Sequence, residues 1–427
     1  MQKLQWHTVQ KRVNELIPQE INPRTISDKQ MSDLKKSLKK YNLVEVPAID
    51  LNGKILAGHQ RIKALQLLGR SEELIDVRIP NRTLTKKESD EYLIGSNALG
   101  GDWNFEALKS FEFDILLNAG FDDIQLAKFW DEEKEIQNDS FNVEHELKKI
   151  IKPKTQLGDI IILGKHKIIC GDSTQPETLK RLLGKEQVSM IYSDPVYNLN
   201  IDYNGGIGGK QDYGGKVNDS RTFEEYKIFI RDSLKSALAI SKPDTHVFYW
   251  CDQVYIGLIQ EVYRNLGINN KRVCLWLKNN QNPVPKVAFN KVYEPIVYGT
   301  RGRPYLTESI TNLNEVLNKE FGTGNELLEQ VNEFVDIWTA KRLSSKDYEH
   351  ATTKPITLHE KAIKRCTKPN NIILDSFLGS GSTLLAGEQL DRRVYGCELE
   401  PRFCDLIIKR YEAFTNNKIK VKRYEKK

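Results

Sequence analysis

Beyond about residue 150, short apolar runs alternate with longer amphipathic stretches, and no other feature constrains the fold as strongly. The apolar runs are residues 160–163, 188–193, 247–251, 273–277, 296–298, 372–374 and 394–397. This alternation predicts strands separated by helices, and strands that are apolar on both sides need cover on both faces. We therefore expect an α/β fold with a mostly parallel sheet and helices on both faces. Two insertions interrupt the pattern, a Gly-rich stretch at 204–215 and a polar helical segment at about 306–350.

An earlier part of the chain, from about residue 14 to 80, predicts a second and smaller α/β unit. Ser27 and Gln30 match a capping box, and the apolar residues that follow them have helical spacing. The pair Asn52-Gly53 between two apolar runs predicts a hairpin with a type I′ turn. A second helix is expected directly after this hairpin.

The length of the chain, 427 residues, exceeds the usual size of one domain, so separate cores are expected. We place a small N-terminal α/β domain at 1–85, a helical connector and linker at 86–152, and the domain with the large sheet at 153–427. The acidic stretch 131–135 and the polar run after it predict the linker, which Pro153 closes.

Composition and charge exclude several classes of protein. Apolar residues at 39% and charged residues at 29% are typical of a folded globular chain, and a net charge of +6 agrees weakly with a polyanionic partner. The six cysteines form no CxxC pair, which argues against a zinc site and a disulfide framework and fits a reducing cytoplasm. No apolar run approaches the roughly 20 residues of a membrane span. We expect no metal, no membrane partner and a cytoplasmic location.

One segment combines the features of a nucleotide-type site. The apolar run 372–374 leads into a turn with Gly379 and Gly381, and a helix is expected from about Thr383. Glycine permits positive φ and close approach of the backbone, so a ligand can lie against the turn and the helix N-terminus. Glu398 ends the next strand, where an acid accepts hydrogen bonds from ribose hydroxyls in such folds. The turn lacks the ending of a P-loop and the full GxGxxG pattern, which favours adenosine without a phosphate chain; a purely structural glycine turn is the alternative.

A second segment, Asp194-Pro195-Val196-Tyr197, follows the predicted strand 188–193 and so lies at the carboxyl edge of the sheet, where open α/β folds bind ligands. An exocyclic amine of adenine or cytosine is a poor nucleophile because its lone pair is delocalised into the ring. The Asp194 carboxylate and the Pro195 carbonyl could accept its two N–H bonds and free that lone pair, while Tyr197 offers a face for stacking on the base. An ordinary Asp-Pro turn after a strand is the structural alternative.

Together the two segments resemble the amino-methyltransferases of DNA, in the β-class order in which a DPPY-type motif precedes an FxGxG-type motif, over roughly residues 155–415. Further matches have the order and spacing of the family. They are Gly171-Asp172 as the GD element, residues 275–278 and 293–298 as later strands, and Thr353-Lys354-Pro355 as the TxKP element.

The resemblance implies a Rossmann-like methyltransferase sheet, S-adenosyl-L-methionine as the cofactor, and a target base flipped out of double-stranded DNA. By the resemblance, the catalytic residues are Asp194, Pro195 and Tyr197. The implied cofactor-binding residues are Asp172, Lys354, Pro355, Asp375, Phe377, Gly379, Gly381, Ser382 and Glu398. Phe377 would lie near the sulfonium, and the segment at 306–350 would recognise the target sequence.

Two positions depart from the family pattern. Val196 and Ser376 stand where the family usually has proline, so the backbone at each position gains an N–H and loses a fixed φ. The Asp, Tyr and Gly positions of both motifs are intact. We therefore expect an active enzyme, with a weakened or inactive relative as the alternative.

The N-terminal domain resembles the ParB/sulfiredoxin-like fold over roughly residues 14–80. Gly58 stands where sulfiredoxins have a cysteine, so reductase chemistry is not expected. ParB proteins bind nucleotide phosphates at a helix N-terminus, and Gly58, His59 and Arg61 could bind an anion in the same way. The alternative is that Arg61 pairs with an acid in a structural role.

The favoured interpretation is a site-specific DNA methyltransferase of restriction-modification type that acts on N6 of adenine, because cytosine-N4 enzymes more often have Ser at the position of Asp194. Cytosine N4, RNA as the substrate, and a non-catalytic ParB-like DNA-binding protein with a degenerate methyltransferase domain are the alternatives. We expect a bacterial or phage-encoded, nucleoid-associated protein that is a monomer or a homodimer.

Overall fold

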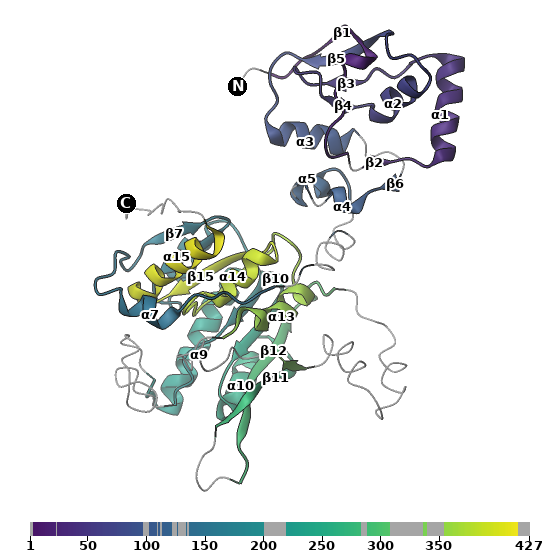
Figure 1. Ribbon diagram of the computed structural model, residues 1–427. Coiled ribbons are helices and arrows are strands. Elements are labelled where there is room, and N and C mark those ends of the chain that lie inside the picture. Colours follow the sequence, from purple (N-terminus) through teal and green to yellow (C-terminus); the bar gives the residue numbers. More distant parts are fainter. Residues whose placement is uncertain are drawn as a thin grey trace, which may run out of the picture. The chain divides into compact units, whose positions relative to one another are not determined.

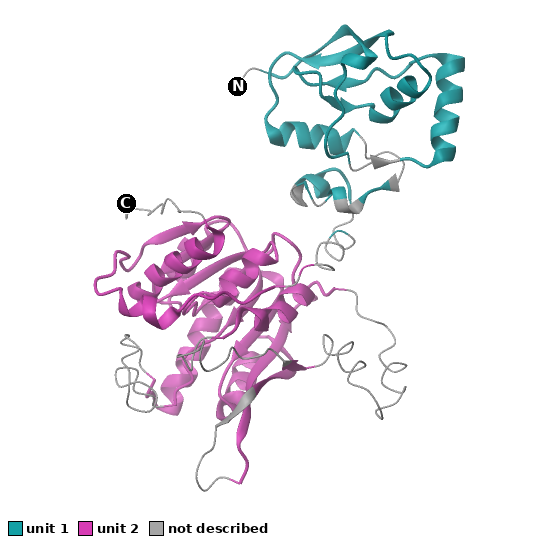
Figure 2. Ribbon diagram, viewed as in Figure 1, with its two compact units in different colours: residues 1–130 teal, residues 131–427 magenta. Residues whose placement is uncertain are grey.

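The chain divides into two compact units, residues 1–130 and 131–427, in the computed structural model (Figures 1 and 2). The structure describes residues 3–22, 24–96, 102–108, 110–111, 113–121, 126, 134, 136–199, 219–282, 288–307, 336–339 and 354–416. The Gly-rich stretch 204–215, Thr353 and most of the predicted recognition segment 306–350 lie outside the described residues. No helix in the described ranges is long and apolar enough to cross a membrane.

The first unit contains a four-stranded sheet in the order β1-β5-β3-β4. Its strands are β1 (Trp6–Arg12), β3 (Ala48–Ile49), β4 (Ile55–Ala57) and β5 (Leu74–Pro80), and its helices are η1 (Val13–Glu15), α1 (Asp28–Tyr41), α2 (His59–Leu67) and α3 (Lys86–Gly95). Apolar residues of the strands and of α1 and α2 pack into one core. The smaller α/β unit expected from the sequence is therefore present.

Local sequence signals explain two features of this unit. The Ser27 side chain accepts the N–H of Gln30, which completes the predicted capping box at the start of α1. The hairpin of β3 and β4 is also present, but its predicted type I′ turn is wrong. Gly53 alone of the central pair has positive φ (84°), and the Asp50 carboxylate accepts the backbone N–H groups of Asn52 and Lys54, both at 2.8 Å.

The predicted connector is divided between the two units. In the first unit, α4 (Phe105–Leu108) and α5 (Phe113–Asn118) pack with Leu93 and Ile94 of α3 in a small core of their own, and β2 (Arg24–Thr25) pairs with β6 (Asp102–Trp103). In the second unit, α7 (Val143–Lys148) packs on the last helix of the chain. The domain names given to 1–85, 86–152 and 153–427 stay predictions.

The second unit is built on a nine-stranded sheet in the order β13-β11-β12-β10-β9-β14-β15-β8-β7. The strands are β7 (Ile160–Leu163), β8 (His166–Cys170), β9 (Val188–Ser193), β10 (Ser241–Trp250), β11 (Asn269–Asn282), β12 (Lys291–Arg301), β13 (Ile337–Thr339), β14 (Ile372–Asp375) and β15 (Arg393–Glu398). From β10 to β8, every pair of adjacent strands is parallel. At the two sides of this group, β12 is antiparallel to β10 and β7 is antiparallel to β8. A mostly parallel sheet is thus confirmed.

Helices cover both faces of this sheet, as predicted. One core contains apolar residues of α8 (Pro176–Leu183), α9 (Phe223–Ala239) and α10 (Ile256–Asn265). The other contains residues of η3 (Ile356–His359), α13 (Glu360–Cys366), α14 (Ser382–Gln389) and α15 (Pro401–Thr415). Successive apolar residues of the inner strands belong to alternate cores, which is why these strands have apolar residues on both faces.

The strand order reverses between β9 and β14. From β9 the chain passes through α9 to β10 on one side, and from β14 it passes through α14 to β15 on the other side. Ligands of open α/β sheets bind at the carboxyl ends of the strands beside such a reversal. The fold therefore marks the carboxyl ends of β9 and β14 as the place for a site.

Candidate active site

Both predicted motifs lie at this reversal. Asp194 follows the last residue of β9, and Asp375 is the last residue of β14. The two strands pair in parallel, and the backbone N–H of Ser376 donates to the Ser193 hydroxyl at 3.2 Å. The predicted catalytic loop and the predicted cofactor turn are thus adjacent, although 180 residues of sequence separate them.

Side chains of two neighbouring segments hold the catalytic loop. The buried Tyr226 of α9 donates its hydroxyl to the Val196 carbonyl at 2.8 Å. Asn198, which has a positive φ of 55°, donates to the Arg221 carbonyl at 2.9 Å and to the Tyr255 hydroxyl at 3.0 Å. These bonds fix the loop at the position where the family usually has a second proline.

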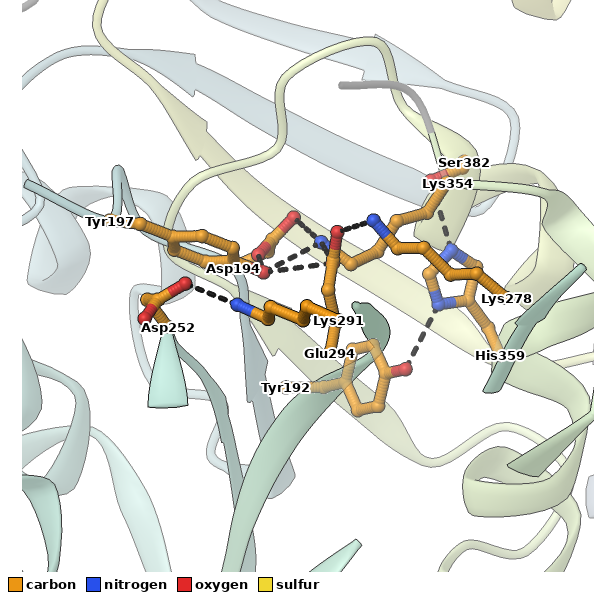
Figure 3. A network of polar contacts seen from close by, with 10 residues as sticks. All are labelled: Tyr192, Asp194, Tyr197, Asp252, Lys278, Lys291, Glu294, Lys354, His359 and Ser382. Carbon is orange, nitrogen blue, oxygen red and sulfur yellow. Dashed lines mark hydrogen bonds and ion pairs between the residues drawn. The ribbon is translucent and has the colours of Figure 1, made fainter. Parts of the chain in front are cut away.

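A network of charged and polar side chains surrounds Asp194 (Figure 3). The Tyr197 hydroxyl donates to the Asp194 carboxylate at 2.9 Å and also lies 3.3 Å from Glu294. The Lys354 ammonium forms an ion pair with Asp194 and lies 3.5 Å from Glu294. Lys278 forms a further ion pair with Glu294. Two carboxylates and two ammonium groups therefore balance each other at the base of the loop.

Burial and charge set the protonation of this network. The side chain of Lys354 is 8% exposed, and although burial alone would lower its pKa, Asp194 and Glu294 raise that pKa above its ordinary value. Burial raises the pKa of Asp194, and the ion pair with Lys354 opposes this rise. Asp194 keeps 30% of its side chain exposed, so its carboxylate is accessible from one side. The ion pair with Lys354 favours the ionised form of this carboxylate.

The glycine turn after β14 has the backbone geometry that the sequence predicts. Gly379 and Gly381 have positive φ values of 53° and 84°. A Cβ on Gly381 would lie 3.2 Å from the side chain of Ile407, which leaves little room for any other residue. The backbone N–H of Gly379 donates to the Glu398 carboxylate at 2.8 Å and so joins the turn to the end of β15.

Two acids next to this turn, Asp375 and Glu398, have raised pKa values. Burial raises the pKa of Asp375, which is 3% exposed, to about 7, and the backbone N–H of Phe377 donates to its carboxylate at 3.1 Å. Burial also raises the pKa of Glu398 to about 7, against the effect of the Gly379 and Glu400 N–H groups that it accepts. The carboxylate of Glu398 keeps unused lone pairs that can accept hydroxyl donors.

Other predicted cofactor residues lie around the same edge. Asp172 follows β8, and its carboxylate accepts the N–H and the hydroxyl of Thr174 at 2.8 and 2.7 Å. The preceding Gly171 donates its N–H to the Glu398 carbonyl at 2.8 Å, which places Asp172 near the end of β15. Pro355 is buried and precedes η3.

His359 fixes Ser382, another predicted cofactor residue. The buried His359 ring lies between the Tyr192 hydroxyl at 3.0 Å and the Ser382 hydroxyl at 2.9 Å (Figure 3). Burial lowers the pKa of His359 to about 3, so the ring is neutral at physiological pH. The contact ties the first residue of α14 to β9, and through β9 to the catalytic loop.

Comparison with known proteins identifies the family. The N6/N4 methyltransferase family model, described as DNA methylase, matches residues 188–409, which is more than half of the chain. The chain belongs to this family of DNA methylases. The Type II methyltransferase M2.DpnII of Streptococcus pneumoniae is 29% identical over 247 residues, 53% of this chain and 84% of that protein. M.HinfI of Haemophilus influenzae is 26% identical over 265 residues, 56% of this chain and 66% of that protein.

Among solved structures, the methylase is similar to the PvuII DNA methyltransferase (cytosine-N4-specific). The TM-score is 0.44 and the sequence identity is 15%, over 61% of this chain and 94% of that one. Membership of the family makes DNA the substrate and S-adenosyl-L-methionine the cofactor of this methylase.

The residues of the turn fit this cofactor. The glycine turn provides an open backbone surface, and Glu398 provides acceptor positions for hydroxyl groups. The buried hydroxyl of Ser376, at a position where the family usually has proline, has no hydrogen-bond partner within the described residues. No described cluster of His, Cys, Asp or Glu could hold a metal ion, and the six cysteines of the methylase are free and buried.

The candidate anion site of the N-terminal unit lies at the start of α2. Gly58, with a φ of 95°, is the N-cap of α2, as an anion site at this helix requires. Arg61 forms an ion pair with Glu45, which is the structural role that the sequence left open. Burial lowers the pKa of His59 to about 4, so its ring is neutral. Nucleotide binding at this position stays a prediction.

Sequence reasoning gave no role to several residues that the structure brings to the site of the methylase. Lys278 directly follows the apolar run 273–277, and Glu294 lies two residues before the start of the apolar run 296–298, and a charge so close to such a run could have marked both as site residues. His359 and Tyr226 have no comparable signal, because a histidine or tyrosine on a helical segment is most often part of a core. Lys354, expected to bind the cofactor, contacts Asp194 and Tyr197 of the predicted catalytic loop.

Proposed function

We propose that this DNA methylase transfers the methyl group to N6 of adenine in double-stranded DNA, and that Asp194, Pro195 and Tyr197 form its catalytic loop. The observation that carries the proposal is the position of the Asp194 carboxylate, which is partly exposed at the carboxyl end of β9, beside the glycine turn of β14. Aspartate at this loop position favours adenine over cytosine. The relatives named above support a DNA target in general.

In the proposed mechanism the loop activates the exocyclic amine of a flipped-out base. The Asp194 carboxylate accepts one N–H of the amine, and the Pro195 carbonyl, which accepts no hydrogen bond from another described residue, takes the other. The nitrogen then moves toward tetrahedral geometry and its lone pair becomes available. S-adenosyl-L-methionine supplies the methyl group from a positively charged sulfur. Asp194 stabilises the positive charge that develops on the nitrogen and is placed to take its proton.

The roles of the cofactor residues are part of the same proposal. Glu398 accepts the ribose hydroxyls, and Asp172 lies on the side of the adenine. Asp375 and the turn at Gly379 hold the methionine part. Phe377, Gly381, Ser382 and Pro355 shape the pocket. Lys354 is better assigned to the loop, because its ammonium contacts Asp194 and Tyr197.

The test is a transfer assay with labelled S-adenosyl-L-methionine and double-stranded DNA, followed by digestion to nucleosides. We expect label in N6-methyl-2′-deoxyadenosine from the wild-type protein. Asp194→Ala should abolish transfer, because the amine loses its main acceptor, while the cofactor dissociation constant measured by calorimetry stays within about twofold. Asp232→Ala, which removes an aspartate paired with Arg231 on α9, is the matched control and should remain active.

Three results would contradict the proposal. Label in N4-methyl-2′-deoxycytidine would make the methylase a cytosine-N4 enzyme. Unchanged turnover by Asp194→Ala would refute the assignment of the loop. No label from a wild-type protein that binds the cofactor, with DNA or with RNA, would favour a DNA-binding module with a degenerate methyltransferase domain.

A further inference from the structure

The residues just before the large sheet, 136–139, pack against the helices of the second unit and do not form the linker that the sequence predicts. Gln137 exchanges two hydrogen bonds with Gln389 at the end of α14, at 2.8 and 3.0 Å. Asn138 exchanges two with Thr357 of η3, at 3.3 and 3.2 Å. We call residues 136–139 the strap. Paired bonds of this kind fix both the position and the direction of the strap.

The last residue of the strap reaches the cofactor turn through one arginine. Both carboxylate oxygens of Asp139 accept the guanidinium of Arg410 on α15, at 2.6 and 2.8 Å. The remaining terminal nitrogen of Arg410 donates to the carbonyl and to the hydroxyl of Ser380, at 3.0 and 3.1 Å. The side chains of Arg410 and Asp139 are only 4% and 11% exposed. Ser380 stands between Gly379 and Gly381, so the contact reaches the centre of the turn.

The chemistry of arginine makes this contact a positioning device. A guanidinium is planar, and its donors have fixed directions, so a partner bound on one edge determines where the other edge points. Asp139 binds two donors and thereby directs the third at the Ser380 carbonyl. A turn with two glycines at positive φ has weak conformational preferences of its own and needs such support.

We propose that Asp139 and Arg410 are positioning residues for the cofactor turn, which makes the strap part of the cofactor site. The inference rests on the proposed role of this turn in holding S-adenosyl-L-methionine. The pair does not touch Asp194 or its partners among the described residues, so its effect falls on cofactor binding and leaves the chemical step unaltered.

The test compares cofactor affinity with turnover in two single variants and, below, in one double variant. Asp139→Asn keeps the shape of the side chain and loses the charge that orients Arg410. Arg410→Lys keeps the charge but cannot bind Asp139 and Ser380 in the same fixed geometry. For both we expect the dissociation constant and the KM of S-adenosyl-L-methionine to rise about tenfold, the loss associated with a charged hydrogen bond. The kcat at saturating cofactor and the KM for DNA should stay within about twofold.

Removal of one member of a buried ion pair can also unfold a protein, so the double variant Asp139→Asn, Arg410→Gln tests the same contact without a buried unpaired charge. The control is Lys134→Met, which removes an ion pair to Asp391 from the residue near the start of the strap without touching the turn. It should bind the cofactor like the wild type.

The outcomes separate the inference from the proposed function. If the wild type binds no S-adenosyl-L-methionine, the proposed site fails and the inference fails with it. If the wild type binds and the folded Asp139 and Arg410 variants bind equally well, only the inference is overturned. An equal loss in Lys134→Met, or a loss in kcat without a change in cofactor KM, would also overturn it, because a general role of the strap would then explain the data.

Discussion

Asp194 and Glu294 share the ammonium of Lys354, which is almost fully buried between them and next to the Tyr197 hydroxyl. Two neighbouring carboxylates can both stay ionised only while a cation compensates them, since each otherwise raises the pKa of the other. Lys354 also packs over the ring of Trp250, with Nζ 4.4 Å from the ring centre. A residue expected at the cofactor thus sets the charge state of the predicted catalytic group.

Replacement of Lys354 should change both the rate and its pH dependence. In the proposed mechanism transfer requires ionised Asp194, whose pKa is already above its ordinary value, so activity should fall as the pH falls through that raised pKa. Lys354 lowers this pKa. In Lys354→Met we therefore expect the acidic limb of the kcat profile to move to higher pH, with kcat at neutral pH reduced about a hundredfold. Rates measured from pH 5 to 9 at saturating substrates test this.

Two further variants make the prediction specific. Lys354→Arg should restore part of the activity and return the acidic limb toward the wild-type position, because it returns the charge. Lys278→Met removes the other ammonium on Glu294 and leaves the pair of Asp194 and Lys354 intact, so its acidic limb should move less. An unchanged profile in Lys354→Met would show that Lys354 has no influence on Asp194.

For single residues, the sequence predicts which side chains come together only where the topology of the sheet determines their positions. Asp194, Asp375 and Glu398 each lie at the carboxyl end of a parallel strand, so one edge of the sheet brings them together. The contact of Lys354 with Asp194 joins residues 160 apart in the sequence and depends on the direction of one side chain. Packing sets that direction, and no periodic pattern in the sequence predicts it.

Among the elements, the glycine turn between β14 and α14 places a strict requirement on its own sequence. Gly381→Ala places a Cβ at a φ of 84° and 3.2 Å from Ile407. We expect a loss of roughly 1–2 kcal/mol in the free energy of unfolding, the cost of a left-handed conformation for a residue with a side chain. The cofactor dissociation constant should rise as well, because the turn must shift. Denaturant unfolding and calorimetry measure both effects.

Gly257→Ala is the matched control for this substitution. Gly257 lies in α10, and a Cβ there would have no heavy atom within 4 Å. Alanine is favoured over glycine in a helix by up to about 1 kcal/mol, so this variant should be as stable as the wild type or more stable, with unchanged cofactor affinity. A Gly381→Ala protein of wild-type stability would mean that the turn tolerates a side chain.

Elements with strong apolar or capping signals were predictable from the sequence, and elements without them were not. The strand β9 is buried at all six positions and mostly apolar, and α1 has its capping box. The strand β1 was missed because it is an edge strand with mostly exposed residues, and its pairing with β5 is non-local. The strand β8 is five residues long and contains the polar His166 and Lys167, which hid its apolar character.

For the whole molecule, the structural boundary of the second unit lies before the strap. Residues 136–150 contribute Ile136 to the main core and Val143, Leu147 and Ile150 to the contact with α15. A fragment of residues 131–427 should therefore fold and bind S-adenosyl-L-methionine with wild-type affinity. A fragment of residues 153–427 lacks these apolar side chains and Asp139, so we expect a lower melting temperature and weaker cofactor binding. Circular dichroism melts and calorimetry on both fragments decide this.

If the fragment of 153–427 binds the cofactor as tightly as that of 131–427, the strap is dispensable. A fragment of 131–427 that fails to fold would instead show that the second unit needs the first. Residues 1–130 form a compact unit with cores of their own, and we expect them to fold as a separate fragment.

The order of the strands in space was beyond the sequence. The strands β14 and β15 come last in the chain and yet lie in the middle of the sheet, between β9 and β8. Alternation of apolar runs predicts that these strands exist and are mostly parallel, but it contains no information on which strands are neighbours. That order follows from non-local pairing, which local sequence patterns do not determine.

The six cysteines have a consequence for experiments on this molecule. All are buried and belong to the second unit. Burial raises the pKa of the thiols of Cys274 and Cys366 to about 12 and also raises the pKa of the Cys251 thiol. A thiol reagent can react with them only when the sheet opens, because the reactive thiolate is disfavoured in the native state. The rate of alkylation therefore measures how readily the methyltransferase sheet opens. This measurement needs no engineered label, and it does not report on the first unit, which has no cysteine.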